Sequence, residues 1–106
     1  MEVGTRPFTV SEVTRSVRAV LEERFGVVRI RGEISNFKEA SSGHLYFSLK
    51  DRQSQLRAVM FRGDVWGLRF LPADGLEVEI TGELTVYEAR GDLQVIVRRM
   101  APAGTG

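Results

Sequence analysis

The hydrophobic period of this chain changes once, at Gly26, and that change limits the folds open to it. From Val10 to Val20, valines recur at spacings of three and four residues, which predicts a helix with one apolar face. After Gly26, apolar and polar residues alternate as they do along a strand with one buried side. The sequence therefore predicts a mainly β domain with an N-terminal α-helix at about residues 9–25, packed by its apolar face.

The start of this helix is marked by Thr9 and Glu12, which fit the T-x-x-E pattern of a capping box. In a capping box, each of the two side chains accepts a hydrogen bond from a backbone N–H that the first helical turn leaves unpaired. Gly26 is a natural end for the helix.

Five segments with the period of strands follow the helix. They are residues 27–37, 44–50, 55–62, 76–89 and 93–100. The turn at 51–54 is short enough for a hairpin, so the second and third strands are expected to pair antiparallel. The segment 63–75 has no clean period and is predicted to hold a short helix or a wide connection.

Two of these strands carry a glycine at their centre, in IRGEIS at 30–35 and in ITGELT at 80–85. Such a glycine marks a bulge, a bend or a close approach of another backbone. Long strands that bend sharply suit a small barrel. The predicted fold is a five-stranded OB-fold barrel with the helix covering one open end. A β-sandwich is the rival fold, although five strands are few for one.

Composition limits the kinds of site that the chain can hold. Its 106 residues suit one domain, predicted as a flexible lead-in at 1–7, the OB-fold domain at 8–100 and a linker at 101–106. With no cysteine and one histidine, a disulfide and a His/Cys metal cluster are excluded, so no metal and no cofactor are expected. The sequence has no P-loop, G-x-S-x-G or H-E-x-x-H motif, and no catalytic residue is predicted.

The N-terminus lacks the apolar region of a signal peptide, and no apolar run approaches the roughly 20 residues of a membrane span. These features predict a cytoplasmic protein without a membrane partner.

The alternation in 44–50 defines a candidate binding face. Its outward side chains are those of His44, Tyr46, Ser48 and Lys50, joined across the hairpin by Arg57, Val59 and Phe61. Bases stack on aromatic rings for about 1–3 kcal/mol each while cations track the phosphates, so this mixture fits single-stranded nucleic acid. Arg62 would set a phosphate clamp beside the ring of Phe61. The pattern alone leaves the face open between a binding surface and an ordinary solvated one.

Three motifs carry a resemblance to a known family: G-E-I-S-N-F from Gly32, S-G-H-x-Y-F-x-L-K-D from Ser42, and Y-E-x-R-G-x-x-Q from Tyr87. In their order and separation, over about 8–104, the chain resembles the N-terminal domain of the exodeoxyribonuclease VII large subunit. One departure is Leu93, where the family often carries tyrosine.

The resemblance implies an OB-fold domain that binds single-stranded DNA, followed by a nuclease region that this segment lacks. It also implies a parent enzyme, a hydrolase, that degrades single-stranded DNA from either end and binds a small subunit through downstream regions. The chain is accordingly expected to be a fragment with no catalytic site of its own. Carried onto matching positions, the nucleic-acid-binding candidates are Asn36, Phe37, His44, Tyr46, Lys50, Arg57, Phe61, Arg62, Tyr87 and Arg90.

Two alternatives keep other functions open. An anticodon-type RNA-binding OB domain is one, because RGEIS and GHLYFSLKD loosely resemble such domains. A protein-docking or dimerisation module is the other, using the helix and the segment 63–75. That segment offers Trp66, Leu68, Phe70 and Leu71 as apolar anchors, although these residues also suit a core.

Overall fold

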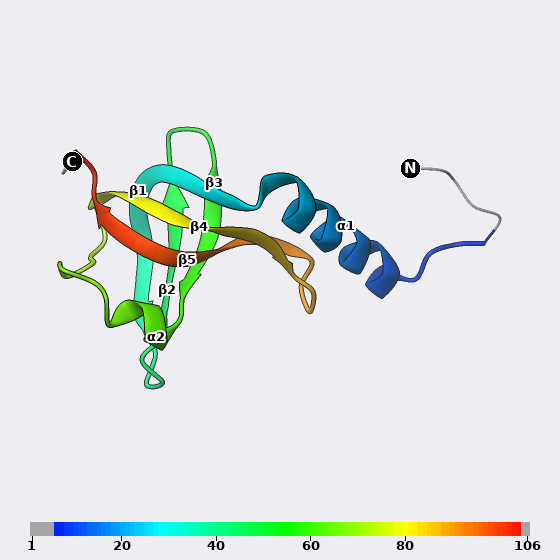
Figure 1. Ribbon diagram of the computed structural model, residues 1–106, viewed down its shortest axis with the longest axis horizontal. Coiled ribbons are helices and arrows are strands. Elements are labelled where there is room, and N and C mark those ends of the chain that lie inside the picture. Colours follow the sequence, from blue (N-terminus) through cyan, green and yellow to red (C-terminus); the bar gives the residue numbers. More distant parts are fainter. Residues whose placement is uncertain (1–5, 105–106) are drawn as a thin grey trace.

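The five strands close into a barrel, and the N-terminal helix lies off one end of it (Figure 1). The structure is a computed structural model and describes residues 6–104, so most of the predicted lead-in and the last two residues lie outside the described residues. The elements are α1 (Val10–Phe25), β1 (Val27–Glu39), β2 (Leu45–Lys50), β3 (Gln55–Met60), α2 (Arg62–Val65), β4 (Glu77–Tyr87) and β5 (Asp92–Pro102). Their order around the barrel is β1-β2-β3-β5-β4, and the predicted five-stranded OB-fold is confirmed.

The core fills the inside of the barrel with alternate residues of the strands. Ile34, Val78, Val95 and Val97 are completely buried. Leu45, Phe47 and Leu49 of β2 also point inward, as the alternation predicts. Burying one such side chain contributes about 1.5–3 kcal/mol, so the strand faces are fixed by this row of side chains.

Strand ends differ from the sequence prediction by a few residues. β1 runs on to Glu39, and β5 runs to Pro102, taking two residues from the predicted linker. The end of β5 continues because Ala101 and Pro102 pair with Glu79 and Val78 of β4. The segment 63–75 does contain a short helix, α2, which begins one residue earlier at Arg62.

Gly82 allows β4 to pair with two neighbours in a closed barrel. A bulge lies between Thr81 and Gly82 in the ladder with β5, and on the other side Gly82 pairs with Val28 of β1. A Cβ atom at Gly82 would overlap the carbonyl oxygen of Ile96. The strand glycine therefore marks both a bulge and a close backbone approach, as the sequence predicts.

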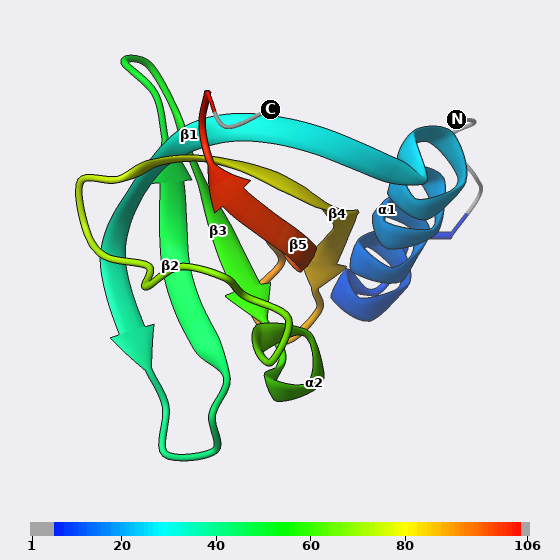
Figure 2. The same ribbon diagram turned by 60° about the vertical axis from the view of Figure 1, so that its left-hand side comes forward.

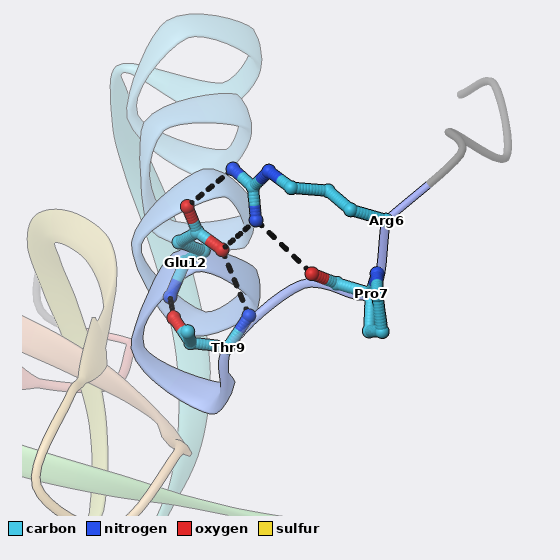
Figure 3. A network of polar contacts seen from close by, with 4 residues as sticks. All are labelled: Arg6, Pro7, Thr9 and Glu12. Carbon is cyan, nitrogen blue, oxygen red and sulfur yellow. Dashed lines mark hydrogen bonds and ion pairs between the residues drawn. The ribbon is translucent and has the colours of Figure 1, made fainter.

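The capping box at the start of α1 is present and is reinforced by an arginine (Figure 3). The backbone N–H of Thr9 donates to Glu12 Oε1 at 2.8 Å, and that of Glu12 donates to Thr9 Oγ1 at 3.1 Å. The Arg6 guanidinium donates to both carboxylate oxygens of Glu12, at 3.1 and 2.9 Å. Arg6, and then the Thr9 backbone, lower the pKa of Glu12 from its ordinary 4.5 to about 2.

The predicted packing of α1 by its apolar face is wrong. The helix lies beside the end of β4 and the following loop (Figures 1 and 2) and meets them with polar side chains. Thr85 Oγ1 donates to Glu22 Oε2 at 3.2 Å, and Arg18 forms an ion pair with Glu88. Val13 and Val17 of the valine row each remain 43% exposed. The polar partners on β4 and in the loop after it decide how the helix is rotated, and they are not visible in the helix sequence.

Gly82→Ala is expected to lower the free energy of unfolding by roughly 1–3 kcal/mol or more, because the added methyl group overlaps the Ile96 carbonyl. Gly63→Ala is the matched control, since a Cβ atom there meets nothing within 4 Å. Urea unfolding of both variants measures the difference. Equal stability of the two variants would contradict the close approach at Gly82.

Glu12 is expected to make the first turn of α1 sensitive to acid. Because its folded pKa lies below its unfolded value, the stabilisation is full above pH 4.5 and is lost as the pH falls towards about 2. Amide hydrogen exchange in α1, corrected for the intrinsic pH dependence of exchange, should show the first turn opening across this window. Glu12→Gln should lack that extra opening. Glu23→Gln, an exposed change on the same helix, should behave like the parent protein.

Candidate nucleic-acid interface

The β2–β3 hairpin brings the predicted face together. Its register places Ser48 opposite Arg57 and Tyr46 opposite Val59, and residues directly opposite each other share one side of a sheet. The register is set by the turn, where Asp51 Oδ1 accepts the backbone N–H groups of Gln53 and Ser54, each at 2.9 Å. These two hydrogen bonds lower the pKa of Asp51. The outward side of β1, β2 and β3 is called the outer face below.

His44, Phe61 and Arg62 form a connected cluster at one end of the outer face. The backbone N–H of Arg62 donates to His44 Nδ1 at 3.0 Å, so Nε2 carries the proton of the neutral imidazole and is left to donate. The rings of His44 and Phe61 meet edge to face, with centroids 5.3 Å apart. The Arg62 side chain lies over Gly43, where a Cβ atom would come within 3.1 Å of Arg62 Cγ and Cδ. The cluster therefore presents the ring of Phe61, the free ring nitrogen of His44 as a donor, and the guanidinium of Arg62 as a cation.

A groove crosses the outer face near its other end. Its volume is about 410 Å³ and its lining residues are Asn36, Ser48, Gln55, Arg57, Asp92 and Leu93. They come from β1, β2, β3 and β5, so the groove runs across the strands. The lining offers two amides, a hydroxyl and a guanidinium, which can bind phosphate oxygens or base edges. Beside them lie the carboxylate of Asp92 and the apolar Leu93, which is 48% exposed.

A bulge in β1 decides which side chains reach the outer face there. The pairing with β2 skips a residue between Ser35 and Lys38, and Asn36 has a positive φ of 53°. The extra residue turns Phe37 inward, where its ring lies 6.4 Å from that of Phe47. It also brings Lys38 opposite Tyr46. Phe37 is therefore packed on the core, and Lys38 takes a place on the outer face.

The other predicted residues are spread along the edges of this face. Tyr46 and Phe61 are exposed by 45% and 40%. Lys50 is exposed and faces Glu33 Oε2 at 3.9 Å, which partly balances its charge. Tyr87 and Arg90 lie at the β4–β5 turn, where Tyr87 pairs with Asp92 of the groove lining.

Sequence reasoning missed Lys38, Gln55 and Leu93 as members of the interface. The sequence pattern does not reveal Lys38, because strict alternation from the buried Ile34 predicts an inward side chain at that position. Asn36 is the available signal, since asparagine accepts the left-handed backbone that such an irregularity needs. Within residues 6–104, no group of three or more His, Cys, Asp or Glu side chains is placed to hold a metal ion.

Comparison with known proteins decides the family. Residues 8–101 match the family described as "OB-fold nucleic acid binding domain". The chain belongs to this family. The barrel is therefore that of an OB-fold nucleic acid binding domain.

Curated relatives show which proteins of this family the chain resembles in sequence. The Exodeoxyribonuclease 7 large subunit of Tolumonas auensis is 48% identical over 99 residues, which cover 93% of this chain and 22% of that protein. The one from Geobacter metallireducens is 48% identical over 101 residues, covering 95% and 22%. The predicted resemblance is confirmed. The chain spans about a fifth of the length of these relatives.

Solved structures share the fold at low sequence identity. A replication protein A heterotrimer bound to ssDNA contains a chain with a TM-score of 0.60 and 14% identity, covering 74% of this chain and 58% of that one. Asparaginyl-tRNA synthetase from Pyrococcus horikoshii also has a TM-score of 0.60, with 15% identity, covering 73% of this chain and 19% of that one.

Across residues 6–104, the helices lack the length and apolar character that a membrane-spanning helix needs.

Asn36→Ala is expected to destabilise the domain by about 1–2 kcal/mol, because the left-handed backbone at this position is unfavourable for alanine. Asn36→Gly is the matched control and should be close to neutral, since glycine adopts positive φ readily. Thermal unfolding of both variants measures the difference. If the two substitutions lower the stability of the domain equally, the positive φ at Asn36 is not what the position requires.

Proposed function

We propose that the outer face of this domain binds single-stranded DNA without reading its sequence. The observation that carries the proposal is the hairpin register, which puts Tyr46 and Arg57 on one side of the sheet beside the groove. The contacts of His44 then hold Phe61 and Arg62 at the end of the same hairpin. Aromatic faces stack with any base, and arginine pairs with any phosphate, so such a surface is tolerant of sequence.

Fixed geometry supports this role. His44 is held by the backbone of Arg62, and Arg62 is held over Gly43, so neither side chain has to be ordered entirely by the ligand. Lys38 lies opposite Tyr46 across the β1–β2 ladder, which puts a cation next to a stacking ring. A strand laid across the hairpin would meet rings and cations in turn. Phe37 is outside this proposed contact set because it packs on Phe47.

The similarity to Exodeoxyribonuclease 7 large subunits supports a wider proposal for the parent protein. In it, this domain holds single-stranded DNA for a nuclease region that degrades the strand from either end, and a small subunit binds outside the present chain. The proposed location is the cytoplasm, in keeping with a sequence that has no cysteine.

Binding to a labelled oligo-dT is expected to weaken as salt rises. If Lys38, Arg57 and Arg62 each neutralise one phosphate, the logarithm of the affinity should fall against the logarithm of salt with a slope of about −2. Fluorescence anisotropy over a salt series measures this slope. A slope near zero would contradict phosphate contact, and tighter binding of a matched RNA would favour the RNA-binding alternative.

Phe61→Ala and Arg62→Ala are each expected to weaken oligo-dT binding by about 1–3 kcal/mol, through loss of a stacking ring or a phosphate contact. Phe25→Ala and Arg24→Ala are matched controls, because these neighbours at the end of α1 are exposed and lie off the outer face. Fluorescence anisotropy with oligo-dT measures the affinity of all four variants, and unfolding curves check that each of them is folded. Equal losses in both pairs would contradict the proposed face.

A further inference from the structure

A second and larger groove lies mainly on β4 and β5, and it meets the β2–β3 hairpin only at Met60, the last residue of β3. Its volume is about 890 Å³, and it runs between the C-terminal half of β5, the start of β1 and the segment after α2. Figure 2 shows α2 below β5, with the segment after α2 leading from there towards β4. The residues that matter below are Met100, Leu68, Phe70, Val27, Arg69 and Arg99.

The lining of this groove is mainly apolar. Met100 is buried, while Leu68 and Phe70 pack partly against the core and show their remaining surface to the groove. Val27 is 66% exposed and adds to one wall. A methionine at the floor suits a ligand of irregular apolar shape, since its side chain is flexible and polarizable.

The charges around the groove leave a positive excess. The carboxylates of Asp64 and Glu79 already have partners: Arg98 Nη1 lies 3.3 Å from Asp64 Oδ2, and Arg29 Nη2 lies 2.7 Å from Glu79 Oε1. Arg98 also donates to Glu83 Oε2 at 2.8 Å, and the two carboxylates raise the pKa of Arg98.

Arg69 and Arg99 line the same groove, are exposed, and have no carboxylate partner within the described residues. Two guanidinium groups are thus free to pair with a ligand, while the acids of the groove are already neutralised. A guanidinium binds a carboxylate through two parallel hydrogen bonds, so a negatively charged ligand complements this rim.

A nucleic-acid strand suits this groove less well than a peptide. Binding of single strands depends on aromatic faces on which successive bases stack, and the one aromatic ring among the lining residues, Phe70, is half-buried against the core. An extended peptide with alternating apolar and acidic side chains matches both features. It can place its apolar side chains on the floor and its carboxylates on the rim.

We infer that the groove on β4 and β5 is a docking site for an acidic peptide segment with apolar side chains, presented by a partner protein. Arg69 and Arg99 hold its carboxylates, and Met100, Leu68 and Val27 receive its apolar side chains. These five residues all lie outside the β2–β3 hairpin, although Met60 at the end of β3 also lines the groove, so we expect the domain to hold a peptide and a DNA strand at the same time. This inference does not depend on the proposed DNA binding.

The test uses a short fluorescein-labelled peptide in which Asp alternates with Leu, titrated with the protein. We expect saturable binding below about 1 mM. Arg69→Glu and Arg99→Glu should each weaken it about tenfold, as loss of a charge-assisted hydrogen bond does. Arg24→Glu, the same reversal at an exposed site on α1, should leave it unchanged. Peptides with Asn in place of Asp, or Gly in place of Leu, should bind more weakly.

Localisation and competition complete the test. Amide NMR shifts on peptide addition should concentrate at 67–70 and 98–101, and saturating oligo-dT should not displace the peptide. Absence of binding, equal losses in Arg24→Glu and the two groove variants, or displacement by oligo-dT would each overturn the inference. It is also overturned if the groove variants weaken oligo-dT binding, because the groove then belongs to the nucleic-acid path. Failure of oligo-dT binding alone leaves the peptide result intact and contradicts only the proposed function.

Discussion

Closure of the barrel depends on the contact between the backbone of Gly82 and the carbonyl of Ile96. β4 has to pair with β1 along one edge and with β5 along the other, and the bulge before Gly82 lets it turn from one to the other. A Cβ atom has no room there. Once β4 is in place, β5 reaches β3 through a short parallel ladder at Arg57–Val59, and the sheet has no free edge.

The proposed DNA surface follows from this closure and from one further irregularity. The short β2–β3 turn fixes which residues of the hairpin stand opposite each other, and the bulge at Asn36 decides what β1 adds to them. Because the bulge inserts one residue, it exchanges the sides of Phe37 and Lys38, giving a ring to the core and a cation to the surface. The outer face gains charge without losing packing.

The two grooves share strands β1, β3 and β5 and differ in chemistry because different side chains of those strands line them. The one on the hairpin side combines hydroxyl, amide and guanidinium groups and lies on the same face as two exposed rings. The one on β4 and β5 has an apolar floor and arginines whose neighbouring acids are already paired. In the two proposals, one surface of the barrel binds nucleic acid and another binds a peptide of a partner protein.

The sequence by itself determined the mainly β fold, the capping box at Thr9 and Glu12, the inward row of β2 and the special role of Gly82. Each of these rests on local rules: the period of strands, the chemistry of helix ends, and the cost of a side chain where a backbone approaches. Tertiary structure decided the rest. The exchange of Phe37 and Lys38 requires pairing with β2, and the rotation of α1 depends on Thr85 and Glu88. The arginines around the second groove come from segments far apart in the chain. Only the closed barrel brings such partners together, so no local pattern could have shown them.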